Sequence, residues 1–538
     1  MGHGRQNKWL WAGWLIFFGL IFLPSVWFFT LALSRVEPGE AGTAAFSERT
    51  LGLLGRSLVL GVGASGLALV LGTATGYLTT RIAFRGRRFF FVALLLPFFL
   101  PGYVYSTAWI ELLAREALVA DAMSSPSAVY SMWSAIAVLA LHLFPWIHLV
   151  AGAGFASIEG HLDDAARLAL SGPSRFVKIT LPLVAGVLAS AGLFVFVIGL
   201  KSHNIPMLLR QRVFATEIMI AYEALGDDRG AALLGLVCAA VSLAALGLAL
   251  WVALRRRRIA IEGLSSPWRD SGHATRAGSV IAALVALAVF AAAAALPMMT
   301  IVRTAGAWSN YRIVWQSAWP QVVNGLVTAS AVATLSAILG FLLAEQIGRS
   351  GRVMAALTVS ALLSLFAMPA PVLDLGLIRF WNRPGPMGWV YDSRAMLVLG
   401  QTAAFLPIAV LGLSVALRRI DPHLIEAAEM AGVPWRTIAL RILWPMLRVW
   451  LIGVWAVVFV LSLNDAETAV LLAPAGQATL SVRIMTLLHY APDAQVSALC
   501  VIQVIATAAA IGFVAIVGMV WSRKARWKSV SGSTKEAN

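Results

Sequence analysis

Long apolar stretches separated by short polar segments run along the whole chain. A helix needs about 20 predominantly apolar residues to cross the hydrocarbon core of a bilayer. By this measure the first part of the chain contains predicted spans at 9–33, 51–80, 89–112, 131–156, 183–200 and 230–254. The second part contains predicted spans at 277–302, 321–347, 353–379, 394–417, 447–464 and 496–521. The pattern predicts an all-α membrane protein with about twelve transmembrane helices.

The composition agrees with a membrane location. Of the 538 residues, 60% are hydrophobic and only 12% are charged, whereas a soluble domain carries about 25% charged residues. Arg5 and Lys8 precede the first apolar stretch, which is longer than the core of a signal peptide and lacks a small-x-small cleavage site. We therefore expect an uncleaved first span. Cys238 and Cys500 both lie in apolar stretches and predict neither a disulfide nor a zinc site.

The basic residues give the expected orientation. The formal net charge is +16, and the Lys and Arg residues form short clusters between apolar stretches. This arrangement indicates topology signals rather than nucleic-acid binding. With the N-terminus in the cytoplasm, about two thirds of the 41 Lys and Arg residues fall on the cytoplasmic side. The sequence thus predicts a multi-pass protein of a bacterial inner membrane with both termini in the cytoplasm.

The chain also contains an internal repeat. Residues 158–166, IEGHLDDAA, recur as 420–428, IDPHLIEAA, at an offset of 262. Leu58 and Gly72 match Leu326 and Gly340 at an offset of 268. Since each copy holds an even number of predicted spans, the two copies form a parallel repeat of six helices each. We expect a first transmembrane domain at 1–254, a cytoplasmic linker at 255–276, a second transmembrane domain at 277–522, and a basic cytoplasmic tail at 523–538.

The recurring segment is amphipathic and too polar to cross a membrane. In the second copy Asp421 is placed to cap a helix that has Pro422 at its first position. Gly432 then predicts the end of that helix, and a second helical stretch at 435–443 ends at Pro445, where the next span begins. Two short helices joined by a glycine turn would lie on the cytoplasmic surface, with the paired alanines 427–428 forming a flat patch for another protein.

These residues resemble a known family. Glu426–Ala428, Gly432, Ile442 and Pro445 resemble the EAA loop of ABC importer permeases, at the spacing and location of that motif. The two copies in one chain resemble a permease with two fused halves. The segments 97–103 and 471–474 are similar to the permeases of the ferric-iron and thiamine group.

The first copy of the loop, at 158–182, departs from the family pattern. Its acid is Asp164 rather than Glu, although Ala165 and Ala166 are kept. Leu170 occupies the glycine position, and Gly172 follows two residues later. We therefore expect this loop to be remodelled, with a weaker or differently shaped contact to its partner.

The resemblance implies a transport function for the chain. Each loop would contact one of two copies of a cytoplasmic ABC ATPase, an extracytoplasmic binding protein would deliver the solute, and membrane lipid would surround the helices. Ferric iron is the first candidate for the solute, followed by thiamine or another small organic ion. The chain has no phosphate-loop motif, so we expect it to bind no cofactor and to catalyse no reaction, with ATP used by the partner. The residues that the resemblance assigns to ATPase coupling are Asp164, Ala165, Ala166, Gly172, Glu426, Ala427, Ala428, Gly432 and Pro445.

A polar segment follows the fifth span of each half. Lys201, His203 and Asn204 open the first, and Asn464, Asp465 and Glu467 open the second. Charges at membrane depth cost roughly 2.5–3.5 kcal/mol each on insertion scales, so they usually face a cavity or a partner. The candidate residues for a pathway or gate are Asn464, Asp465, Glu467, Glu217 and Arg483. The alternative is that they lie in solvated outer loops. Carboxylates suit hard cations, but the sequence assigns no metal site.

Two other classes of membrane protein are alternatives to a permease. A twelve-span carrier that works without ATP remains an alternative, although residues 85–88 lack the aspartate that accompanies the basic loop of the major facilitator family. A membrane-embedded enzyme is disfavoured because His142 and His148 lack a metal-ligand spacing. Glu111, Glu345 and Asp374 lie near predicted span ends, where interfacial solvation explains them.

Overall fold

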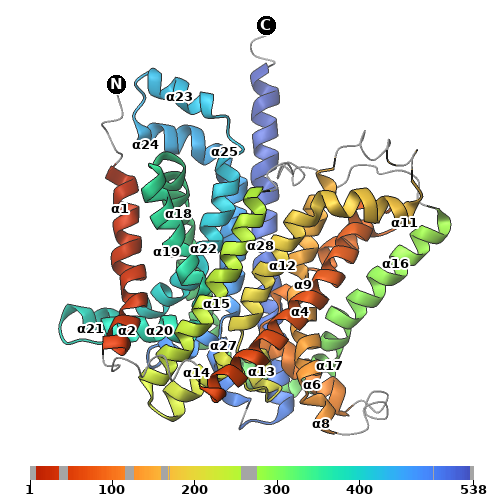
Figure 1. The fold of residues 1–538 in the computed structure, drawn as a ribbon, viewed down its shortest axis with the longest axis vertical. Coiled ribbons are helices and arrows are strands. Elements are labelled where there is room, and N and C mark those ends of the chain that lie inside the picture. Colours follow the sequence, from red (N-terminus) through yellow and green to blue (C-terminus); the bar gives the residue numbers. More distant parts are fainter. Residues whose placement is uncertain are drawn as a thin grey trace.

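The computed structural model describes residues 8–34, 47–115, 126–158, 166, 168, 170–255, 275–488 and 490–533. Within these residues the regular structure is entirely helical (Figure 1). Asp164 and Ala165 of the first loop and most of the expected linker, 256–274, lie outside the described residues. The division into two domains therefore stays a prediction.

Nine helices in the described part of the chain are long and apolar enough to cross a membrane. Each coincides with a predicted span. They are α4 (Glu48–Arg81), α9 (Met132–Ala156), η3 (Phe176–Thr180) with α12 (Leu181–Lys201), α15 (Asp228–Arg255), α16 (Arg276–Phe290) with η6 (Ala291–Ala295) and α17 (Leu296–Ala305), α18 (Trp308–Arg349), α22 (Arg394–Leu417), α24 (Trp435–Thr437) with η7 (Ile438–Leu443) and α25 (Trp444–Asn464), and α28 (Asp493–Ser533).

Two predicted spans are broken rather than straight. The span expected at 89–112 consists of α5 (Arg87–Ala93), η2 (Leu96–Phe99) and α6 (Gly102–Arg115), with a bend of 98°. The span expected at 353–379 consists of α19 (Arg352–Ala367) and α20 (Ala370–Trp381), with a bend of 109°. Pro101 and Pro369 lie at these breaks at the repeat offset of 268. A proline lacks the N–H that an unbroken helix requires, so each helix ends there.

The predicted first span is also helical, as α1 (Lys8–Ile16), η1 (Phe17–Phe22) and α2 (Leu23–Ser34). Its apolar part, Trp11–Trp27, is shorter than the nine helices above. The described residues thus contain nine candidate spans, or eleven if each bent pair counts as one. The predicted number of twelve stays a prediction.

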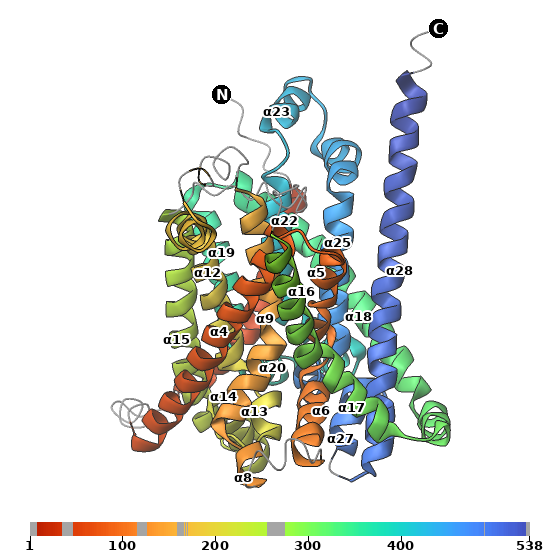
Figure 2. The same cartoon turned by 90° about the vertical axis from the view of Figure 1, so that its right-hand side faces the viewer.

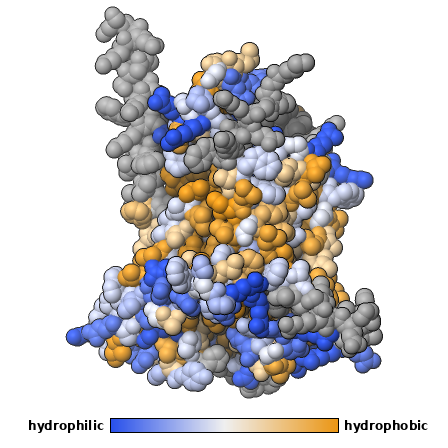
Figure 3. Space-filling model, turned by 90° about the vertical axis from the view of Figure 1, so that its left-hand side faces the viewer, coloured by the Kyte–Doolittle hydropathy of each residue, from blue (hydrophilic) through white to orange (hydrophobic). Residues whose placement is uncertain are grey.

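The surface of the molecule carries an apolar band. On the face that Figure 3 shows, apolar side chains gather across the middle and polar side chains gather toward both ends. A soluble protein rarely exposes so large a continuous apolar surface. The band therefore fits helices that face lipid.

The two ends of the molecule carry different short elements. One end holds α23 (Pro422–Met430), the start of α1 and the end of α28 (Figures 1 and 2). The opposite end holds several other short helices, among them α13 (Asn204–Leu208), α14 (Phe214–Met219), η4 (Ile220–Ala224) and α27 (Leu480–Leu487). We refer to these as the α23 end and the α14 end. The remaining short helices are α8 (Pro126–Val129), α11 (Gly172–Arg175), α21 (Pro386–Tyr391) and α26 (Glu467–Leu472).

The first helix of each predicted half packs against the bent pair of the other half. α2 packs on α20, and α17 packs on α6. Gly376 of α20 allows the first contact, because a Cβ atom there would lie 2.4 Å from the backbone oxygen of Ser25. Beside the second contact, the hydroxyl of Tyr105 in α6 donates to the backbone oxygen of Ala293 in η6, the turn that precedes α17, at 2.8 Å. This exchange ties the two halves into one body.

Candidate functional site

The second EAA-like segment forms an exposed helix at the α23 end. The carboxylate of Asp421 accepts a hydrogen bond from the backbone N–H of His423 at 3.0 Å, as expected for an N-cap. Gly432 has a φ of +73°, a conformation that favours glycine, and it turns the chain between α23 and α24. The predicted cap, helix and glycine turn are therefore all present in the structure.

The faces of α23 differ in exposure. The side chain of Glu426 is 64% exposed, and Ala427 is exposed beside it. Ile425 and Ala428 pack against the hydrophobic core below the helix. The helix is thus held from one side, and its acidic and alanine residues remain accessible to another protein.

The segment after Gly432 differs from the expectation. A separate short helix was expected to end at Pro445, but α24, η7 and α25 follow one another as a continuous helical segment that contains Pro445. The turn before the proline is π-helical. The same succession occurs in the first copy, where the π-helical turn η3 precedes Leu181 and Pro182. A wide turn accommodates a proline without ending the helix.

The first copy of the loop is described only in part. Ala166 is buried, with 5% exposure, whereas Leu168 is 93% exposed. Gly172 begins the short helix α11 and does not turn the chain as Gly432 does. The local structure of this loop thus differs from that of the second copy, and the role expected for Gly172 stays a prediction.

A polar cluster joins the two predicted halves. The Nδ1 atom of His203 lies 3.2 Å from Oε1 of Glu467, and the backbone N–H of His203 donates to the same oxygen at 3.3 Å. Glu467 begins α26, and His203 precedes α13. Residues that are 264 positions apart in the sequence therefore form one polar contact.

Two further hydrogen bonds cross between the halves at the helix breaks. The ammonium group of Lys201 donates to the backbone oxygen of Phe366 at 2.8 Å and lies 4.2 Å from the centre of its ring. The amide of Asn464 donates to the backbone oxygen of Phe99 at 2.9 Å. Each carbonyl belongs to a helix that ends at a proline break and so lacks a partner within its own helix. A side-chain donor at the end of the fifth span of each half thus forms a hydrogen bond with the free backbone carbonyl of the broken helix in the other half.

The carboxylates of the cluster are held differently. Asp465 accepts from the side chain of Gln401 at 3.1 Å and from the backbone N–H of Thr468 at 3.3 Å. Asp374 is completely buried, and neither of its carboxylate oxygens has a hydrogen-bond partner among the described residues. A buried carboxylate is costly unless another group compensates it. The expectation of interfacial solvation was therefore wrong for Asp374, since the bend before α20 turns it into the protein.

The same correction applies to Glu345. Its side chain is 7% exposed and forms an ion pair with Arg349 one turn later. The ring of His148 is buried and contacts the hydroxyl of Thr75 at 2.9 Å and the backbone oxygen of Phe91 at 3.2 Å, which gives it a structural role. Among the described residues, no three His, Cys, Asp or Glu side chains are arranged to hold a metal ion.

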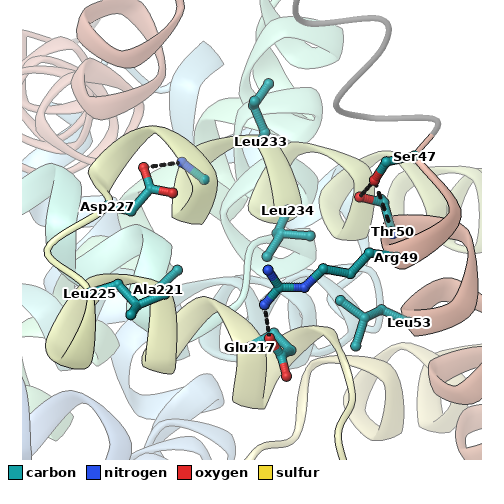
Figure 4. Close-up of a pocket in the computed structure, with 11 residues that line it drawn as sticks. Ser47, Arg49, Thr50, Leu53, Glu217, Ala221, Leu225, Asp227, Leu233 and Leu234 are labelled. Carbon is teal, nitrogen blue, oxygen red and sulfur yellow. Dashed lines mark hydrogen bonds and ion pairs between the residues drawn. The ribbon is translucent and has the colours of Figure 1, made fainter.

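The other two candidate gate residues lie apart from this cluster. Arg483 of α27 donates to the hydroxyl of Ser317 at 3.1 Å. Glu217 of α14 borders a cavity of about 190 Å³ at the α14 end (Figure 4). Arg49 reaches across this cavity to Oε2 of Glu217 at 2.8 Å, and Arg212 donates to Oε1 at 2.6 Å. The five candidates therefore do not form one site.

The pKa of Glu217 follows from these contacts. Its side chain is 1% exposed, and burial by itself raises the pKa. The hydrogen bonds and charges of Arg49 and Arg212 outweigh burial and bring the pKa of Glu217 below its ordinary value. The sequence pointed to Glu217 but not to its two arginine partners: Arg49 lies 168 residues earlier in α4, and Arg212 lies five residues before Glu217, just ahead of α14.

The described helices and their contacts define a multi-pass, all-α membrane protein. An Fe(3+)-transport system permease protein of Haemophilus influenzae is 27% identical over 199 residues, which are 37% of this chain and 37% of that protein. A putative ferric transport system permease protein of the same organism is 24% identical over 437 residues, 76% of this chain and 68% of that protein. The ferric transport system permease protein of Actinobacillus pleuropneumoniae is 24% identical over 497 residues, 86% of this chain and 70% of that protein.

No family model matches the chain. The relatives nevertheless confirm the resemblance, because three of them are named as permeases of ferric or Fe(3+) transport systems. The chain is a homologue of transport permeases and resembles the ABC importer permeases of the ferric-iron group. Permeases are transport subunits rather than enzymes.

The ion pairs of Glu217 predict a pH-dependent stability. A carboxylate with a lowered folded-state pKa stabilises the fold above its unfolded pKa of about 4.3, and this contribution is lost as the pH falls through the folded value. At pH 7, Glu217→Gln should lower the free energy of unfolding by roughly 1.5–3 kcal/mol. Thermal unfolding in detergent at pH 7 and at lower pH values measures the difference between variant and wild type.

The matched control is Glu48→Gln, which removes an exposed carboxylate close to Arg49. Its effect should stay below about 1 kcal/mol, because the charge is solvated. A stability gap between Glu217→Gln and wild type that is the same at acidic and neutral pH would contradict the role assigned to the two arginines.

Proposed function

We propose that this chain is the membrane permease of an ATP-driven importer of a bacterial inner membrane. The observation that carries the proposal is α23, an exposed helix with Glu426 and Ala427 on its accessible side. Two copies of a separate ATPase would contact the loops at 158–182 and 420–445, and the α23 end would face the cytoplasm. An extracytoplasmic binding protein would deliver the solute to the α14 end. The chain itself would bind no cofactor.

Ferric iron is the solute that we propose. The names of the three relatives support it. The carboxylates of Asp374, which is completely buried, and of Asp465 and Glu467, which are partly buried, have the oxygen ligands that hard cations prefer. Because no metal-holding group is arranged among the described residues, we propose that the binding protein selects the ion. These carboxylates would only line its path.

The transport mechanism that we propose is alternating access between two states. The contacts from Lys201 to Phe366, from Asn464 to Phe99 and between His203 and Glu467 join the two halves. They would form a gate that is closed in this structure. ATP-driven movement of the two loops would separate the halves and break these contacts.

The substrate is tested by uptake of radiolabelled ferric iron in cells that lack this chain, with and without its restoration, and with thiamine uptake measured in parallel. Restoration of ATP-dependent iron uptake alone is the expected result. Restored thiamine uptake without restored iron uptake would overturn iron and leave the importer assignment standing. Uptake that is independent of ATP would favour a carrier and overturn the importer.

Glu426→Lys should uncouple ATP hydrolysis from uptake while the protein stays in the membrane, because it reverses a charge on the accessible side of α23. The expected loss of uptake is about tenfold or more, which corresponds to a typical coupling energy. Asp164→Lys, at the matching position of the remodelled loop, should lose less. Equal losses would contradict the asymmetry, and normal uptake in the double variant would contradict the coupling role.

The gate is tested by cross-linking across the two halves. In a chain with Cys238 and Cys500 replaced by alanine, His203→Cys and Glu467→Cys place two thiols at the observed contact. A disulfide between them should stop uptake, and a reducing agent should return uptake to the level of the unlinked double variant. Each single variant, treated with the same oxidant, is the control. Undiminished uptake in the linked protein would show that these residues do not separate during transport.

A further inference from the structure

Arg349 is the last residue of α18, and its side chain joins three elements. Its Nη1 atom donates to Oε1 of Glu429 in α23 at 2.5 Å. Its Nε atom donates to Glu345, one turn earlier in α18. The guanidinium carbon lies 4.1 Å from the ring centre of Trp435 in α24. One side chain therefore contacts both sides of the glycine turn at Gly432.

The chemistry of these contacts fixes the orientation of the guanidinium group. The buried carboxylate of Glu345 needs a paired charge, because an unpaired one is strongly destabilising. A guanidinium group is planar, donates through several N–H groups at once, and also stacks on aromatic rings. The contact with Glu345 thus fixes the plane of the Arg349 guanidinium group. Glu429 pairs with this group, and Trp435 stacks on it. A flexible ammonium group would not hold the same geometry.

α18 is suited to carry a displacement away from this point. It packs against α22, α25, α27 and α28. Asn324, further back in the same helix, accepts a hydrogen bond from Arg394 at 2.9 Å and donates to the backbone oxygen of Ala478 at 3.3 Å. From Asn324 to Arg349 the helix is about 38 Å long, at about 1.5 Å per residue. Its internal proline, Pro320, precedes this stretch.

The first half has an arginine at the matching position but a different environment. Arg81 ends α4 at the repeat offset of 268, and it donates to the backbone oxygen of Ile158 at 3.3 Å. The residue that matches Glu345 is Tyr77, whose ring packs against Phe155 and Phe176 with centres 5.3 and 4.7 Å away. Aromatic packing thus replaces the acid–arginine pair at this point of the first half.

We propose that Arg349 is a positioning residue that fixes α23 and α24 to α18. When the exposed loop moves, α18 would then move with it as one body. This inference rests on the proposed function, in which an ATPase moves α23. It adds the side chain that transmits the movement.

The test measures whether α23 and α18 move as one body. Spin labels are attached to Leu424→Cys in α23 and Ile338→Cys in α18, both exposed, in a chain with Cys238 and Cys500 replaced by alanine. The full chain is purified with the ATPase that accompanies it, and the distance between the labels is measured with and without ATP and vanadate. With native Arg349, we expect one narrow distance that does not change with ATP.

Arg349→Gln should broaden this distance and make it change with ATP. It should also lower solute uptake about tenfold while ATP hydrolysis continues, as for the loss of a typical coupling energy. Glu429→Gln should broaden the distance while it leaves the pair of Arg349 and Glu345 intact, so it tests the contact without disturbing α18. The double variant should be no worse than Arg349→Gln, because both changes remove the same contact.

Arg352→Gln is the matched control, since Arg352 is an exposed arginine three residues further along the chain. It should behave as the native chain. A narrow, ATP-independent distance in both Arg349→Gln and Glu429→Gln would overturn the positioning role and leave the proposed function standing. If no ATPase accompanies the native chain, or ATP causes no change in uptake, the proposed function fails and this inference fails with it.

Discussion

The backbone oxygens of Phe99 and Phe366 lie where a helix ends at a proline break inside the protein. In an apolar environment an unsatisfied carbonyl costs several kcal/mol, so each must find a donor. Asn464 and Lys201 provide those donors from the other half of the chain. In this state of the protein, each bend is therefore stabilised by a donor from the other half. The polar cluster between the halves thus supports the fold of this state and also forms a candidate gate.

The first helix of each half packs on the other half, so each half also depends on the other through these helices. α2 covers the bent pair of the second half, and α17 covers that of the first half. The close approach at Gly376 brings backbone against backbone and leaves no room for a side chain. Each predicted half is thus completed by a helix of the other half, while their contacts in the polar cluster consist of a few hydrogen bonds and the contact between His203 and Glu467. A body joined in this way can change at the polar contacts without coming apart.

The two ends of the molecule serve different purposes under the proposed mechanism. At the α14 end, Arg49 and Arg212 fold onto the buried carboxylate of Glu217. At the α23 end, α23 keeps its acidic and alanine residues accessible, and Arg349 attaches it to the long helix α18. Two differences separate the halves here: Tyr77 occupies the position of Glu345, and Leu170 occupies the position of the left-handed Gly432. The second loop is held by charge, and an aromatic cluster of Tyr77, Phe155 and Phe176 lies at the matching point of the first half.

The sequence by itself determined the features that depend on neighbouring residues. The apolar stretches located all twelve expected helical regions, and Asp421 with Gly432 set the limits of α23, because burial in lipid, capping and left-handed turns are local requirements. The proline positions contained the signal for the two bends, but only the tertiary structure showed that the helices break there. Only the tertiary structure also brought His203 to Glu467, buried Asp374 and placed Arg349 against Trp435. These contacts join residues on different elements, and the order of residues along a chain does not record which distant side chains meet in space.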